Sequence, residues 1–471
     1  MLPPLIRRPR QRATPRSRER GVTMALVALA MVSIIAMAAL SIDIGTLYQA
    51  KDEAQRAADA AALTAARVIS ISGITGDPTN ATSSWQPTCG GASSAATLAA
   101  TSVAQQNLIS GVAVLTANVT VNYGAGKAGG ASLDCSALGT DFGVNPTVTV
   151  TLKSAKLPIF FSRVFSLFGS NYSATTVSAI ASAEVFNSSK SGSVASTIIP
   201  VQPRCVKPWI IPNIDPVNTG KAFVNNTDGS IVSPGVNQLG TGVIGETFNL
   251  EADCKARAGN CSATNMSNNP PILVGGLGGY LEYVPASVQG TPVAVPSCSN
   301  ADAFQQATAG CDENTVYTCG TPGTNASATQ ADLNENPTGR RGDAATSIEC
   351  LINQTVGPDT LDTTPFPFQI RAGLGNPLVQ AGVVNSSNVV TTSDNIVTLP
   401  IYDGTALGAG NNPPVTIVGF LQVFINSVSN VGRPNVTVLN VSGCGNGLTT
   451  TVSSTPVYGT SPVPIRLITA P

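Results

Sequence analysis

Cysteine is the residue type with which this chain could do the most chemistry, and histidine is missing altogether. The ten cysteines are Cys89, Cys135, Cys205, Cys254, Cys261, Cys298, Cys311, Cys319, Cys350 and Cys444. None has the Cys-x-x-Cys spacing of redox motifs and zinc ribbons. An even number of cysteines is typical of disulfides formed in an oxidising compartment. We predict the pairs Cys89–Cys135, Cys254–Cys261 and Cys311–Cys319, and the sequence leaves the other pairings open.

The absence of histidine narrows the possible reactions. It excludes Ser-His-Asp and Cys-His triads, HExxH zinc sites and imidazole ligands. No Walker loop and no GxSxG nucleophile motif is present either. We therefore expect no catalytic residue, no metal site and no cofactor, and we expect that the chain is not an enzyme. An extracytoplasmic hydrolase that works through a pair of carboxylates is the remaining enzymatic alternative.

The longest apolar run extends over residues 22–42, and Val22, Ile34 and Ile42 mark its beginning, middle and end. As a helix it measures about 30 Å, which is one bilayer core, so we predict a transmembrane helix. Seven arginines precede it against one glutamate. The positive-inside rule then places residues 1–21 in the cytoplasm and the rest of the chain outside. Two alternatives are a nucleic-acid-binding arm for the arginines and a signal peptide cleaved after Ala38 for the span.

The helix is expected to continue beyond the span, because neither Gly nor Pro occurs between Thr46 and Ile71. At helical spacing one face is mostly alanine, formed by Leu47, Ala50, Ala54, Ala57, Ala58, Ala61, Ala65 and Val68. Asp52, Arg56 and Asp59 lie on the opposite face, spaced for ion pairing. Small side chains allow close approach of another element. The alanine face therefore suits tight packing against another helix or a compact sheet. We expect it to pack against pilus or platform partners, with docking onto its own domain as the alternative.

These residues carry a family resemblance. The string Ile42-Asp43-Ile44-Gly45, then Tyr48, then Gln55 to Leu63, follows Arg20-Gly21 and the apolar span. It resembles the N-terminal region of the TadE/TadG-like family of Flp (Tad) pilus-assembly proteins. The residues that match the family pattern and are expected to pack the helix are Asp43, Gly45, Tyr48, Gln55, Ala57, Ala58, Asp59, Ala61 and Ala62.

The resemblance implies a bacterial protein anchored in the inner membrane that serves as a structural or accessory part of a pilus assembly system. Its implied partners are the lipid of the inner membrane, other Tad pilus-assembly proteins and pilus subunits. One position departs from processed pilin-like members, which have Glu at the fifth position after the Gly. Leu26 stands there after Gly21, which favours an uncleaved, TadG-like anchor.

The rest of the chain indicates an extracytoplasmic β-protein. Only 11% of all residues are charged, and beyond residue 42 acids outnumber bases, which argues against nucleic-acid binding. Alternating apolar patterns predict strands at 117–123, 147–152, 172–185, 368–371, 395–402, 415–425, 435–441 and 465–468, and apolar spacing predicts a second helix at 95–109. The run 415–425 is too short for a second span and is expected to be a buried strand.

The expected fold class is α+β. A small pilin-like α+β domain over residues 43–190 follows the span. A disulfide-containing, mainly antiparallel β ectodomain covers residues 191–471 and includes a loop-rich, cysteine-containing insertion at about 213–353. The bulk of the chain is expected in the periplasm or at the surface. A surface adhesin or pilus-tip binding protein that uses these loops is the alternative function.

Overall fold

The structure is a computed structural model. It describes residues 19–76, 85–125, 132–139, 142–143, 146–154, 176–185, 201–203, 206–218, 221–226, 243–252, 273–274, 279–288, 292, 298, 302–310, 315, 317, 330–331, 341–364, 367–404, 412–430, 432–443, 457–459 and 465–468. The predicted pairs Cys254–Cys261 and Cys311–Cys319, residues 1–18 and much of the insertion at 213–353 lie outside the described residues.

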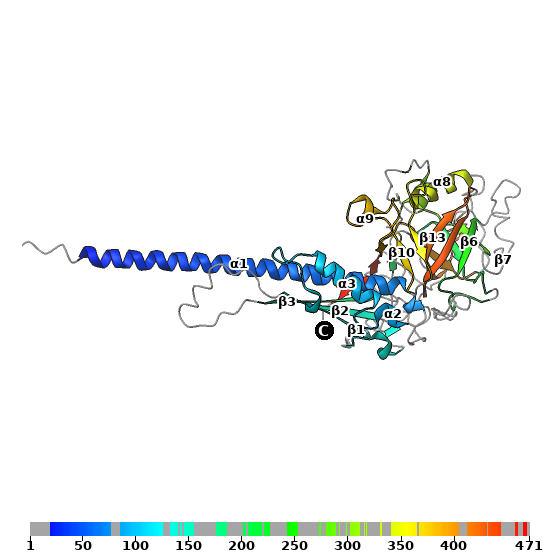
Figure 1. Ribbon diagram of the computed structural model, residues 1–471. Coiled ribbons are helices and arrows are strands. Elements are labelled where there is room, and N and C mark those ends of the chain that lie inside the picture. Colours follow the sequence, from blue (N-terminus) through cyan, green and yellow to red (C-terminus); the bar gives the residue numbers. More distant parts are fainter. Residues whose placement is uncertain are drawn as a thin grey trace, which may run out of the picture.

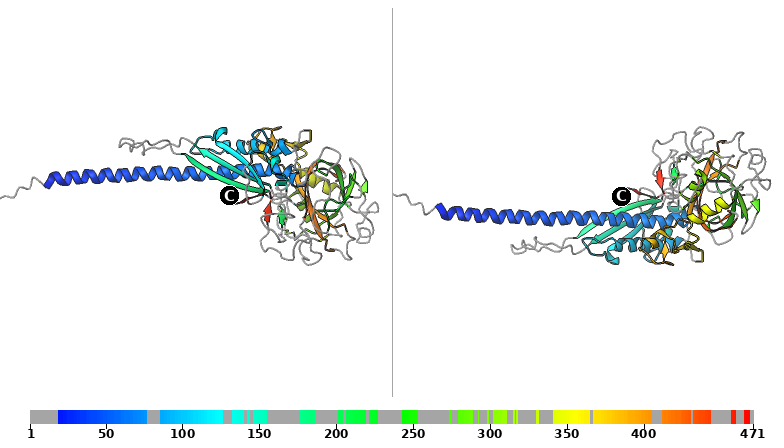
Figure 2. Two further views of the ribbon diagram at one scale, coloured as in Figure 1. Left: turned by 90° about the horizontal axis from the view of Figure 1, so that it is seen from below. Right: turned by 90° about the horizontal axis from the view of Figure 1, so that it is seen from above.

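Helix α1 (Glu19–Ile71) is one uninterrupted helix of 53 residues, as its composition predicts. Its first half extends away from the rest of the described chain, and its second half enters the head (Figures 1 and 2). Ala50 is the first fully buried residue of the helix, and from there on one face of α1 is buried. The predicted span and its helical extension are therefore a single rod.

A four-stranded antiparallel sheet covers the second half of α1. Its order is β1 (Val119–Ala125), β2 (Pro146–Ser154), β3 (Val177–Val185) and β16 (Ile465–Ile468). Helix α3 (Ala95–Gln106) packs on another side of α1. Short elements complete this unit, namely η1 (Ile74–Gly76), α2 (Gln86–Cys89), η3 (Thr116–Asn118) and η5 (Cys135–Leu138). This part has the helix-on-sheet arrangement expected of a pilin-like domain.

The second unit is a seven-stranded sheet. Its strands are β5 (Trp209–Pro212), β12 (Ile396–Tyr402), β13 (Ile417–Val428), β14 (Pro434–Gly443), β6 (Thr247–Ala252), β8 (Tyr280–Pro285) and β7 (Leu273–Val274), in this order. Strand β8 also pairs with β5, so six of the strands close into a ring. Bulky side chains such as Trp209, Phe248 and Leu421 fill its core. Strand β13 is central and almost wholly buried, as predicted for residues 415–425.

Smaller elements surround this sheet. Helices α7 (Ala303–Ala309) and α8 (Arg341–Leu351) pack against each other. A three-stranded sheet of β11 (Val389–Val390), β10 (Gln369–Arg371) and β9 (Thr360–Asp362) lies beside α9 (Pro377–Gln380). Strands β4 (Val201–Pro203) and β15 (Val457–Gly459) form a parallel pair. The described elements thus confirm an α+β fold with mostly antiparallel sheets.

The C-terminal strand changes the expected division of the chain. Our boundary at residue 191 assigned residues 465–468 to the second domain, but β16 pairs with β3 in the first sheet. Arg466 forms an ion pair of 2.8 Å with the buried Glu184 of β3. The second unit is therefore inserted between two adjacent strands of the first sheet. A four-residue apolar pattern predicts a strand but carries no information about its partner.

Candidate functional site: the membrane helix and its seat in the head

The first half of α1 exposes a continuous apolar surface. Val22, Ile34 and Ile42 are each more than half exposed, and none of the most apolar part of the helix is buried within the molecule. Its mean hydropathy there is 2.6. Exposed apolar surface of this size is unstable in water, whereas a helix of this length and composition can cross a bilayer. The helix is thus suited to a membrane core.

The second half of α1 is buried by its own domain. Eight of its alanines are at most 1% exposed, namely Ala50, Ala54, Ala57, Ala58, Ala61, Ala62, Ala65 and Ala66. Helix α3 and strands β2 and β3 cover them. The expected close packing against a helix and a sheet is thus found, but the expectation that pilus or platform partners cover this face is wrong. The small side chains let the chain's own sheet approach the helix closely, which was the alternative.

Polar motif residues fasten the helix to the sheet. The Gln55 amide donates to Asp59 Oδ1 at 2.8 Å and to the Ile180 carbonyl of β3 at 3.0 Å. Asp52 and Arg56 form the expected ion pair at 2.7 Å, with both side chains exposed to solvent. The family motif from Gln55 onward therefore builds the helix–sheet interface.

The other motif residues lie outside this interface. Asp43, Gly45 and Tyr48 occupy the stretch of α1 between the apolar span and the first buried alanine. Tyr48 is 71% exposed. A Cβ placed on Gly45 would meet no atom within 4 Å. The structure thus divides the motif into an open part near the span and a packed part in the head.

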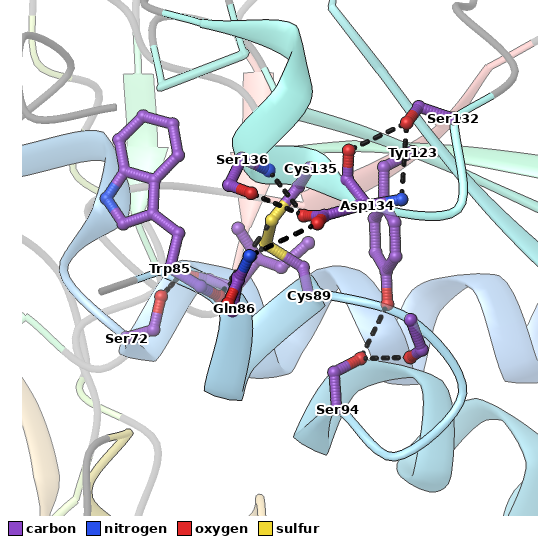
Figure 3. Close-up of a disulfide and its surroundings, with 12 residues drawn as sticks. Ser72, Trp85, Gln86, Cys89, Ser94, Tyr123, Ser132, Asp134, Cys135 and Ser136 are labelled. Carbon is purple, nitrogen blue, oxygen red and sulfur yellow. Dashed lines mark hydrogen bonds between the residues drawn. A yellow bond between two sulfur atoms is a disulfide. The ribbon is translucent and has the colours of Figure 1, made fainter. Parts of the chain in front are cut away.

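A disulfide supports the far end of the first unit. Cys89 of α2 and Cys135 of η5, one of our predicted pairs, are bonded with their Cα atoms 5.5 Å apart (Figure 3). The Asp134 carboxylate next to it accepts from Ser136 N at 2.9 Å, and the side chain of Gln86 also points toward it. A second disulfide, Cys298–Cys350, ties α8 to the segment before α7. The sequence missed this pair because spacing alone does not determine connectivity.

The C-terminal end of α1 is built into the second unit. Asn440 of β14 donates to the Ser70 carbonyl at 2.6 Å and to Thr75 Oγ1 at 2.9 Å, and all three side chains are buried. Ile71 packs in one cluster with Phe424 and Leu439. Nothing in the sequence indicated this junction, because its partners are separated by 370 residues.

Two buried clusters with titratable side chains lie in the second unit. The amide of Asn218 donates to Asp215 Oδ2 at 3.1 Å and to Glu246 Oε1 at 2.6 Å. Burial and the nearby charge of Asp215 raise the pKa of Glu246 to about 8. Elsewhere, Lys207 donates to the Gly310 carbonyl, and burial lowers its pKa to about 7. Asp215 and Glu246 are 0% and 4% exposed, so this carboxylate pair is closed to a substrate.

The described residues contain no group of three or more Cys, Asp or Glu side chains that could hold a metal ion. The distinctive feature of the described chain is the long helix that is exposed and apolar at one end and packed into a β-rich head at the other. This arrangement fits the class of single-pass membrane proteins.

Comparison with protein families agrees with the resemblance. Residues 21–68 match the family described as putative Flp pilus-assembly TadE/G-like. The match starts just before the apolar span and ends in the buried part of α1, so it covers the helix and none of the β-rich unit. It confirms the resemblance of the N-terminal region and relates the chain to Tad pilus assembly. Searches of curated proteins and of solved structures found no match.

Proposed function

We propose that this chain is a membrane-anchored structural or accessory component of a Tad-type pilus assembly system and that it is not an enzyme. The observation that carries the proposal is the continuity of α1. One helix supplies the apolar span, matches the TadE/G-like family and forms the centre of the first domain. A rigid connection of this kind suits a protein that holds its head at a fixed place above a membrane.

The proposed orientation follows from charge and from redox chemistry. Arginines before the span favour a cytoplasmic N-terminus. The head contains the Cys89–Cys135 and Cys298–Cys350 disulfides, which are typical of an oxidising compartment. We therefore place the head in the periplasm or at the cell surface, and the anchor in the bacterial inner membrane.

The proposed partners are other Tad assembly proteins and pilus subunits. Because the alanine face is already occupied, these partners are not expected to bind there. The accessible parts of the family-matched segment include the span itself, the motif residues Gly45 and Tyr48 beside it, and the exposed Asp52–Arg56 pair further along. Partner contacts through α1 are therefore expected at the span or in the turns that follow it, up to Arg56.

A deletion strain tests this proposal. Removing the chain should abolish or strongly reduce Flp pili counted by electron microscopy, and the full chain supplied in trans should restore them. A version with Ile34→Asp and Ile35→Asp in the span should not restore them, while Lys51→Asp is the charge-matched control outside the span. Normal pili together with lost surface attachment would overturn the proposal and favour the adhesin.

A further inference from the structure

A tight hairpin follows α3 at the end of the head that faces the span. Ile109 and Val112 exchange two backbone hydrogen bonds, at 2.8 and 3.0 Å. The two residues between them, Ser110 and Gly111, have φ angles of 51° and 78°. Positive φ at both central positions is the geometry of the tightest hairpin turns, and it is unfavourable for a serine. The conformation therefore needs support from neighbouring groups.

Helix α1 supplies that support. The backbone N–H of Ser110 donates to Glu53 Oε2 at 2.6 Å, and Gln49 donates to Glu53 Oε1 at 3.0 Å. Helical side chains lean toward the N-terminus, so the Glu53 carboxylate lies near the level of Gln49. That level is seven residues beyond Ile42, or about 10 Å along the helix axis. A lipid headgroup layer is roughly 5–8 Å thick, and an ordinary helix tilt lowers one side of the head further.

The hairpin and its flanks expose aliphatic side chains. Leu108, Val112 and Leu115 are 53%, 59% and 68% exposed, while Ile109 and Val114 between them are buried and hold the segment in place. From residue 85 to residue 125 the chain contains no charged side chain. Typical proteins carry about 25% charged residues. The hairpin's own residues therefore bring no charge toward lipid, and the Glu53 carboxylate beside them accepts hydrogen bonds from Ser110 and Gln49.

We propose that Leu108, Val112 and Leu115 form a second membrane contact, which rests on the interfacial region of the phospholipid bilayer that α1 enters. The proposal rests on the proposed anchoring of α1. The lipid surface is the favoured occupant because the patch belongs to the first part of the head beyond the exposed span. With α1 as one contact and the hairpin as another, the tilt of the rod and the direction of the head become fixed.

Fluorescence quenching of the full chain tests this contact. The chain is reconstituted into phosphatidylcholine–phosphatidylglycerol vesicles that contain a lipid with a nitroxide on its headgroup. A tryptophan is introduced as Val112→Trp or, in a second variant, Leu115→Trp. The native Trp85 and Trp209 are buried and give a constant background. Val383→Trp is the matched control, because Val383 is also exposed but lies far from the span. Its neighbour Val384 packs against the cluster of Ile71, and Ile71 is about 43 Å beyond Ile42 along the helix axis.

We expect Val112→Trp and Leu115→Trp to be quenched about twofold or more relative to Val383→Trp, as for residues held at the interface. Ile34→Trp with an acyl-chain nitroxide reports the anchor separately. If Ile34→Trp is quenched but the two hairpin variants are quenched no more than Val383→Trp, the hairpin contact alone is overturned. Unquenched Ile34→Trp would overturn the anchoring and the contact together.

Discussion

Buried polar side chains determine how the two units of this molecule are joined. Asn440 is the clearest case, since its amide reaches from the second unit to the end of α1. Its partners, the Ser70 carbonyl and Thr75, have no access to water. The net stabilisation from a buried hydrogen bond is modest, but removing one partner is costly, because the other buried polar group is left without a hydrogen bond.

Replacing Asn440 is therefore expected to destabilise the protein. Asn440→Ala should lower the free energy of unfolding by about 1–3 kcal/mol, because it leaves buried polar groups without a partner. Urea denaturation of the purified chain measures this. Asn385→Ala, at an exposed loop position, is the control and should change stability by less than about 0.5 kcal/mol. Equal effects of the two variants would contradict the role of Asn440.

Two buried titratable groups predict opposite pH effects. The pKa of Glu246 is raised from 4.5 to about 8, so its contribution to stability is present below pH 4.5 and is lost as the pH rises through 8. The pKa of Lys207 is lowered from 10.5 to about 7, so its contribution is present above pH 10.5 and is lost as the pH falls through 7.

Variants separate the two effects. We compare the free energy of unfolding of each variant with that of the parent. For Glu246→Gln this difference should favour the variant more at about pH 9 than at pH 5, by on the order of 2 kcal/mol. Lys207→Met should show the reverse trend, because it removes a charge that is costly to bury at low pH. Denaturation curves at both pH values measure the differences. Parallel pH profiles for the two variants and the parent would show that neither group titrates as stated.

At the scale of elements, the alanine face of α1 controls the fit between helix and sheet. Ala61→Leu should lower the free energy of unfolding by about 1–3 kcal/mol, because the core around this fully buried alanine has no room for three more carbons. Ala60→Leu, on the half-buried side of the same turn, should cost much less. Thermal unfolding of both variants tests this, and equal losses would mean that the packing around residue 61 does not limit the size of its side chain.

The Cys89–Cys135 disulfide closes a long loop in the first unit. The two residues are 46 positions apart. Replacing both by alanine should cost about 4 kcal/mol by the loop-entropy relation. Hydrogen exchange should become faster in α2, α3 and β1, while β12–β14 in the other unit change less. Unchanged protection in α3 and β1 would contradict this role.

The sequence predicted the local elements better than their partners. Helix α1 and strands β12, β13 and β14 were predictable, because unbroken apolar runs and period-two patterns are local signals. Strands β6, β7 and β8 were not, since they lie in the insertion that we expected to be loop-rich. The place of β16 beside β3 and the contact of Asn440 with Ser70 were not, since they join residues far apart in the chain. The alanine face was recognised as a surface for a helix or a compact sheet, but composition could not distinguish a partner protein from the chain's own domain.

The molecule as a whole is a rod with a β-rich head at one end (Figure 2). Because α1 is continuous between the span and the head, the orientation of one is expected to determine that of the other. Leu47→Pro removes a helical hydrogen bond between them, at a cost of about 3 kcal/mol. Spin labels at residues 35 and 383 should then show a broadened distance distribution, whereas Leu47→Ala should keep it narrow. An unchanged distribution with proline would mean that the hairpin and lipid hold the head without the helix.

The most direct test of the central claim is intact-mass and N-terminal analysis of the full chain from a native bacterial envelope, combined with extraction. A permanent anchor predicts an intact N-terminus and release by detergent only. A start at Val22 would mean prepilin-type processing and would favour a place in the filament. A soluble protein that starts near Ala39 would show that the span is a signal peptide, and it would contradict the anchored rod.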